Sequence, residues 1–244
     1  MIFRTRVIKI STDFFNYCLL LISMAGFVPK HATLPRVIAI TISITFSYLL
    51  AFNYQDNNTI GVIYFLVSEV LYLGFIFLVL SEHGYRHWFI KRWGNQEEGY
   101  LSFEAVLGIL FFHNTASLGF IAATTHGSLF NFVDREILQI ILIVMILAGF
   151  FIKIWSAKVV SIDIYYWKDM FLGKKITEFV ETGPYKFLSN PMYGIGQLQA
   201  YALAIWYGSE IGLLAALINQ VLIFSFYFTV EKKFIKRIYL NSAT

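Results

Sequence analysis

Charged residues are scarce in this chain of 244 residues: Asp, Glu, Lys and Arg make up 14% of it, whereas 58% is hydrophobic. A soluble domain has about 25% charged residues, so the composition excludes an ordinary soluble domain and is typical of a protein with several membrane-spanning helices. The net charge of +4 is small, and the basic residues gather near the ends of apolar runs. That distribution fits lipid headgroups better than nucleic acid.

Cysteine is nearly absent as well. Cys18 stands alone, which excludes a disulfide within the chain and a cysteine-rich metal site. The sequence also lacks a phosphate-binding glycine loop, a nucleophile elbow and a metalloprotease helix. Nothing therefore supports the nucleotide-hydrolysing, serine-hydrolase or zinc-protease classes that these motifs mark, and we expect no bound metal.

What the chain does have is seven long hydrophobic runs, most of them near the roughly 20 residues that a helix needs to cross the hydrocarbon. Lipid offers no partner for open backbone groups, so each run should be helical. We predict an all-α, polytopic membrane protein with about seven transmembrane helices, a C-terminal helical hairpin and an interfacial tail helix. The first run is expected to be retained, although whether it spans is open. The runs are 13–28, 34–52, 60–81, 103–125, 137–156, 191–207 and 211–229.

Basic residues are distributed unevenly between the two predicted sides. Seven spans would place 15 of the 19 lysines and arginines on the side that holds the loop 153–190 and the C-terminal tail. The positive-inside rule predicts that this side faces the cytoplasm. We expect an integral protein of a bacterial inner membrane or of the endoplasmic reticulum. Three basic residues before the first run, on the opposite side, argue against this orientation unless that run does not span the membrane. The four basic residues on the opposite side are Arg4, Arg6, Lys9 and Arg135.

The last two runs are separated only by residues 207–210, which predicts a tight antiparallel hairpin. Asn190 and Glu231 should then be close in space, although about 40 residues separate them. Pro191 suits the first turn of a helix because its missing N–H would be unpaired there anyway. The remaining N–H groups of that turn would carry partial positive charge at the membrane face.

Polar residues form a stripe on each arm of this hairpin. Side chains in such stripes either bond the two helices together or face a water-filled site. Glu69 and His113 lie inside other spans, so each has either a functional role or a buried partner such as a serine, a tyrosine or a backbone carbonyl. The stripes are Asn190, Tyr193, Gly194, Gln197 and Tyr201 on one arm, and Gln220, Phe224, Tyr227 and Glu231 on the other.

An aromatic and acidic run precedes the hairpin. Asp163, Tyr166 and Asp169 would share one face if residues 161–171 form a helix. Carboxylates beside aromatic rings suit an ammonium group, and a carboxylate also accepts the proton that an amine must lose before it attacks. The alternative is an aromatic belt at the membrane surface with ion pairs to Lys158, Lys168 or Lys174.

The segment GPYKFLSNPMYGIG (residues 183–196), followed by the hairpin and a tail that begins with Glu231, resembles the integral-membrane methyltransferases. These include phosphatidylethanolamine N-methyltransferases and isoprenylcysteine carboxyl methyltransferases. Asn190 before Pro-Met-Tyr, and the tail itself, are more similar to the phospholipid enzymes. Lys232 departs from the family pattern, which has a second glutamate there. The resemblance covers about residues 145–240, and residues 1–140 resemble nothing specific.

The resemblance implies an enzyme that uses S-adenosylmethionine, which donates its methyl group without a metal, on an amine lipid headgroup at the cytoplasmic face. It implies a methyltransferase-like catalytic region at 141–244, after N-terminal helices at 1–140 of no recognised role. The alternatives are a carboxyl methyltransferase, an NADPH-dependent enzyme like the sterol reductases, and a lipid-binding protein without activity. The oligomeric state is not indicated. The expected catalytic residues are Asp163, Tyr166 and Asp169; the expected cofactor-binding residues are Gly183, Pro184, Tyr185, Asn190, Pro191, Tyr193, Gly194, Gln197 and Glu231.

Overall fold

The computed structural model describes residues 14–127, 129 and 133–240, and all regular elements in that part of the chain are helices. Five helices are long and apolar enough to cross a membrane, which confirms the predicted all-α membrane fold. The five are α2 (Leu34–Tyr54), α3 (Asn58–Leu80), α5 (Gln96–Thr124), α6 (Arg135–Val160) and the continuous helix Glu210–Leu240, which contains α10 (Glu210–Phe226) and α11 (Lys232–Ile235).

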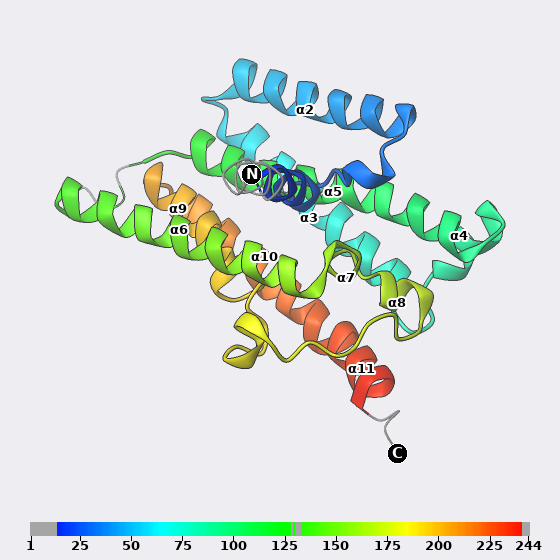
Figure 1. Ribbon diagram of the computed structural model, residues 1–244. Coiled ribbons are helices and arrows are strands. Elements are labelled where there is room, and N and C mark those ends of the chain that lie inside the picture. The colour runs from blue at the N-terminus through cyan, green and yellow to red at the C-terminus, as the bar shows by residue number, and fades with distance from the viewer. Residues whose placement is uncertain (1–13, 128, 130–132, 241–244) are drawn as a thin grey trace, which may run out of the picture.

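Two further apolar helices are short, so the predicted count of seven spans is not confirmed. One is Phe14–Met24; the other is α9 (Leu198–Trp206). Figure 1 shows the first of them nearly end-on, whereas α2, α5 and α6 run across the view, so its axis does not follow theirs. The basic residues Arg4, Arg6 and Lys9, on which its orientation depends, lie outside the described residues.

The helices pack with alternating direction, so that their connections gather at two ends. The start of α3 meets the end of α5, where a Cβ on Gly61 would lie 2.0 Å from Thr124 Oγ1. At this same end the Gly127 N–H donates to the Tyr207 carbonyl (3.2 Å), and the buried hydroxyls of Thr125 and Ser209 are 2.6 Å apart. The 81–95 and 161–190 connections and the tail therefore lie at the opposite end, which carries most of the basic residues.

Ion pairs attach the segment before α2 to the rest of the protein. Lys30 pairs with Asp163, and His31 and Arg36 both contact the buried Glu104 on α5, at 2.6 Å and 3.1 Å. His31, Glu104 and Asp163 place ligand atoms within 4.8 Å of one another. Because Lys30 and Arg36 balance the two carboxylates, we interpret this group as an ion-pair cluster that fixes the fold.

Glu69 and His113, whose roles the sequence left open, both have partners inside the helix bundle. His113 Nδ1 lies 2.7 Å from the Tyr64 hydroxyl. Glu69 accepts hydrogen bonds from the amides of Asn114 on α5 and Asn219 on α10, so that three helices meet at one carboxylate.

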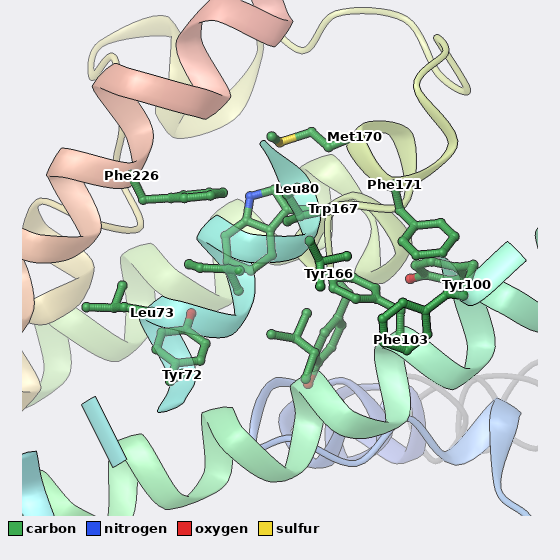
Figure 2. Close-up of a cluster of buried hydrophobic side chains, with 14 of the residues drawn as sticks. Tyr72, Leu73, Leu80, Tyr100, Phe103, Tyr166, Trp167, Met170, Phe171 and Phe226 are labelled. Atoms are coloured by element: carbon green, nitrogen blue, oxygen red, sulfur yellow. The ribbon is translucent and has the colours of Figure 1, made fainter. Parts of the chain in front are cut away.

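An aromatic core anchors the short helices α7 (Ile162–Tyr165) and α8 (Lys168–Leu172), which follow α6. Phe171 stacks on Phe103 of α5 with ring centroids 5.0 Å apart, and Trp167 meets Phe226 of α10 edge to face at 5.4 Å. Figure 2 shows these side chains in one cluster with Tyr72 and Leu73 of α3. The aromatic run at 161–171 is therefore partly core, rather than a belt at the membrane surface.

Candidate functional site

The C-terminal hairpin has the tight turn that its sequence predicts. Gly208 adopts a positive φ of 61°, and the side chain of the next residue, Ser209, caps α10 by accepting the Gly212 N–H at 2.7 Å. Gln220 joins the two arms, because it accepts from the Tyr201 hydroxyl (2.6 Å) and donates to the Tyr193 carbonyl (2.9 Å). Of the two interpretations of the polar stripes, Gln220 fits helix-to-helix bonding.

The junction before α9 is not the helix start that Pro191 predicted. Residues 191–194 form turns, a 3₁₀ turn follows at Ile195–Gln197, and α9 begins only at Leu198. Asn190 Oδ1 accepts the Tyr193 N–H (3.1 Å), and the Gly196 N–H donates to the Pro191 carbonyl (2.9 Å). These local hydrogen bonds stabilise a compact turn. A Cβ on Gly196 would lie 3.2 Å from the Pro191 carbonyl oxygen, so the turn leaves little room for a side chain there. The expected helix N-terminus is thus replaced by a turn.

A cavity of about 360 Å³ lies between this junction, the α7–α8 segment and the tail. Its walls are mainly aromatic, and four carboxylates face it or its rim: Asp169, Glu178, Glu181 and Glu231. A cavity of this kind, mostly apolar with a few converging polar groups, is what a small-molecule site requires. Its aromatic lining consists of Tyr165, Trp167, Phe179, Tyr185, Tyr193, Tyr227, Phe234 and Tyr239.

Glu231 is held in this cavity by two donors from distant parts of the chain. Its Oε2 accepts from the Tyr193 hydroxyl (2.9 Å) and from Trp167 Nε1 (3.2 Å). Glu231 ends a π-helical segment, Tyr227–Glu231, between α10 and α11. Single π-helical turns inside α-helices occur often at functional sites, because they redirect side chains that a regular helix would space differently. Three separate segments therefore converge on one carboxylate.

Trp167 reaches Glu231 because the chain breaks between α7 and α8. Its φ is +54°, a left-handed conformation that is rare for a bulky residue. Such strain costs of order 1–3 kcal/mol and persists only where surrounding contacts enforce it. Here the contacts with Phe226 and Glu231 do so. Sequence reasoning did not include Trp167 among the site residues, because a helix break of this kind leaves no pattern in the sequence.

The same break separates the residues that were expected to share a helix face, so that prediction is wrong in its geometry. Asp163 lies away from the cavity and pairs with Lys30. Tyr166 is fully buried and donates its hydroxyl to the Ser23 carbonyl at 2.6 Å. Only Asp169 lines the main cavity.

Asp169 is a buried carboxylate at the cavity wall. Its Oδ2 accepts from the Tyr239 hydroxyl (2.9 Å), and its Oδ1 accepts from the Met170 N–H (2.8 Å). Burial raises the pKa of Asp169 above its usual range, and these two hydrogen bonds oppose the rise only in part.

This raised pKa predicts a pH-dependent stability difference between the protein and its Asp169→Asn variant. The folded protein binds this proton more tightly than the unfolded chain does. The stabilisation is therefore complete below the ordinary aspartate pKa of about 3.9 and is lost as pH rises through the higher folded value. We expect the melting temperature of the wild type, relative to the variant, to fall between pH 4 and neutrality. A difference that stays constant across that range in detergent would contradict the assignment.

The expected cofactor-binding residues divide into three groups. Tyr185, Asn190, Tyr193 and Glu231 line the main cavity, which lies between the junction and the tail. Gln197 lines a smaller cavity beside it and donates to Asn219. The residues that line neither cavity shape the backbone instead: Gly183, Pro184, Pro191 and Gly194.

Gly183 shows how such a backbone role arises. Its φ is +61°, and a Cβ there would lie 2.9 Å from Val159 Cγ2 and 3.0 Å from Trp155 Nε1. Only glycine combines that conformation with so close a contact to α6. The contact positions Tyr185, whose buried hydroxyl has no well-formed hydrogen bond within the described residues, although Ser156 is near.

Two lysines complete the cavity. Lys232, where the resembling families have a second glutamate, lines it, and its Nζ lies 5.3 Å from the ring centroid of Phe228. Lys236 lines it one turn further on. Neither lysine was among the expected site residues, because the tail sequence alone fits a basic membrane anchor equally well.

Comparison with known proteins places the cavity in a family context. Residues 138–242 match the family model described as phospholipid methyltransferase. Phosphatidylethanolamine N-methyltransferase of Eremothecium gossypii is 30% identical over 95 residues, which cover 39% of this chain and only 11% of that relative. No solved structure is significantly similar to the chain. Trp167, Tyr193 and Glu231 all fall within residues 138–242, the part of this chain that is similar to the phospholipid methyltransferases.

Proposed function

We propose that this protein transfers a methyl group from S-adenosylmethionine to the amine headgroup of a membrane phospholipid. The observation that carries the proposal is the Glu231 carboxylate, held by Tyr193 and Trp167 in an aromatic cavity within the family-matched residues. The distribution of basic residues supports a cytoplasmic orientation of this cavity. The name of the Eremothecium gossypii relative supports phosphatidylethanolamine as the acceptor class.

The cavity has the chemistry that the methyl donor requires. Aromatic side chains offer stacking surfaces for adenine and cation–π contacts for a sulfonium. Glu231 and Asp169 add negative charge to the same walls. The Tyr185 hydroxyl, which lacks a well-formed hydrogen bond, can bond to a polar ligand. The cavity therefore has partners for the positive charge, the aromatic ring and the polar groups of the methyl donor.

The bound donor supplies a methyl group on a sulfonium, which an amine attacks through its lone pair while the carbon–sulfur electrons leave with sulfur. The protein's part is to align the reactants and to take the proton that the amine gives up. Tyr193 Oη lies 2.9 Å from Glu231 Oε2. The tyrosine can accept a proton from the amine as its own moves to Glu231, which faces the main cavity and can release it there.

The three lysines considered as the clamp of a carboxyl methyltransferase lie outside the main cavity, whose own lysines are Lys232 and Lys236. A carboxyl methyltransferase needs a cationic clamp, for which Lys158, Lys168 and Lys174 were the candidates. Lys168 pairs instead with Glu97 (2.7 Å), Lys158 donates to the Tyr17 hydroxyl (2.8 Å), and Lys174 lies 3.5 Å from the Gln96 side-chain oxygen. None of the three lines the cavity.

Calorimetry on the purified protein tests the proposal. We expect saturable binding of S-adenosylmethionine, with NADPH as a control that should not bind. Transfer of labelled methyl groups into phosphatidylethanolamine, compared with a prenylated cysteine acid, then identifies the acceptor class. Absence of saturable donor binding would overturn the proposed function, and NADPH binding in its place would favour a reductase.

A further inference from the structure

A second cavity of about 50 Å³ adjoins the main cavity and shares Tyr165, Trp167, Met192 and Tyr193 with it. Four of its other nine lining residues come from α3 and α5, which lie outside the residues matched by the family model. The N-terminal half of the chain, for which the sequence indicated no role, therefore contributes directly to the candidate site. Its contribution consists of Tyr72, Leu107, Phe111 and Asn114.

A buried negative charge lies behind this cavity. Asn114 and Asn219, both on the wall, donate to Glu69 at distances of 2.6–3.1 Å, and Gln197 donates to Asn219 at 3.3 Å. Glu69 is 3% exposed, and within the described residues no lysine, arginine or histidine forms an ion pair with it. In its ionised form this carboxylate has no cationic partner, so a cation in the adjoining cavity would stabilise that form.

Aromatic rings surround the same space. Phe111 lies between Tyr72 and Tyr165, with ring centroids 5.7 Å and 6.2 Å from its own. Tyr72 is also one helical turn after Glu69 on α3, so both side chains are on one face. Rings and a carboxylate together form the environment that an ammonium group prefers.

Lys153 of α6 also lines this cavity and carries the opposite charge. With the Gln199 amide in its favoured orientation, Lys153 Nζ lies 3.0 Å from the amide oxygen. A simple cation would be repelled by Lys153, and a simple anion would be repelled by Glu69. A zwitterion that carries an amine at one end and a phosphate at the other matches both charges.

We propose that the second cavity is the acceptor subsite, which takes the amine end of a phosphoethanolamine headgroup beside the Glu69 cluster and its phosphate beside Lys153. This inference rests on the proposed function and names the part of the site that selects the acceptor. The shared wall brings the amine next to the main cavity, and Tyr193 borders both spaces. Side chains of α6 near Lys153, among them Phe150 and Phe151, are exposed along the helix, where the acyl chains can lie.

The test measures two constants on the full-length protein: the KM for phosphatidylethanolamine in mixed micelles and the Kd for S-adenosylmethionine. We expect Glu69→Gln and Lys153→Gln each to raise the KM about tenfold, because the first removes the negative charge behind the cavity and the second removes a charge-assisted contact on its wall. The donor Kd should stay within about twofold of the wild-type value, because neither side chain lines the main cavity. Lys158→Gln is the matched control, a lysine on the same helix that lines neither cavity, and should leave both constants unchanged.

The outcomes separate this inference from the proposed function. A wild-type protein that binds the donor and methylates the lipid, with normal KM values in both variants, would overturn the subsite and leave the function intact. A wild-type protein that binds no donor would overturn both. If Glu69→Gln loses donor binding because it misfolds, Lys153→Gln decides alone: a raised KM supports the subsite, and an unchanged one overturns it.

Discussion

Replacing Glu231 with glutamine should lower the rate of methyl transfer about 100-fold or more, the range expected when a group that accepts a proton in the reaction is lost. Glutamine has the same shape, and its carbonyl oxygen has two lone pairs, so it can still accept from both Tyr193 and Trp167, which donate to the single oxygen Oε2 of Glu231. It has no charge, so it neither attracts a sulfonium nor takes a proton. We therefore also expect donor affinity to fall about tenfold, as for one charge-assisted contact. Labelled-methyl transfer measures the rate and calorimetry measures the affinity.

Two further variants make this result specific. Glu178→Gln removes a carboxylate from the rim of the same cavity, but that side chain is 90% exposed, so affinity and rate should change less than twofold. Tyr193→Phe leaves the Glu231 charge in place and removes the hydroxyl between the amine and that carboxylate. It should keep most of the donor affinity and lose rate. Normal rate and affinity in Glu231→Gln would remove this residue from the site.

Replacing Gly108 with alanine should destabilise the protein, although alanine normally stabilises a helix by about 0.8–1.0 kcal/mol relative to glycine. Gly108 lies inside α5, and a Cβ there would be 2.1 Å from the carbonyl oxygen of Gly26. Because the obstacle is backbone, no side chain can rotate away. Overpacking of this kind costs about 1–3 kcal/mol, which corresponds to a fall of about 2–12 °C in the melting temperature of a domain of this size.

Gly74→Ala is the matched control for this prediction. Gly74 is also inside a membrane-spanning helix, α3, but a Cβ there would meet no atom within 4 Å. Its melting temperature in detergent should be unchanged or slightly higher. Equal melting temperatures for the two alanine variants would show that α5 and the Gly26 backbone do not approach as closely as described.

The local patterns that predicted correctly are those whose physical cause is short-range. The hairpin follows from the few residues between two apolar runs, and it brings Asn190 and Glu231 to one cavity. The helical fold follows from the need of backbone groups in lipid to bond within their own segment. Both conclusions hold whichever neighbours the helices have.

Predictions that assumed an unbroken helix were wrong. Asp163 and Asp169 would share a face only if residues 161–171 were continuous, whereas Trp167 interrupts them with a positive φ. The helix expected from Pro191 likewise gives way to turns that Asn190 and Gly196 stabilise. In both places contacts within the tertiary structure outweigh the helical spacing on which the reasoning relied.

The sequence by itself determined that this is a helical membrane protein, and it predicted a site where the 183–196 segment meets the residue that begins the tail. Only the tertiary structure decided which side chains form the cavity. Trp167 reaches Glu231 through a strained backbone, and Glu69 reaches the second cavity through Asn114 and Asn219. Spacing along a chain predicts which residues share a helix face, but contacts between separate helices depend on how all of them pack, and no single segment records that.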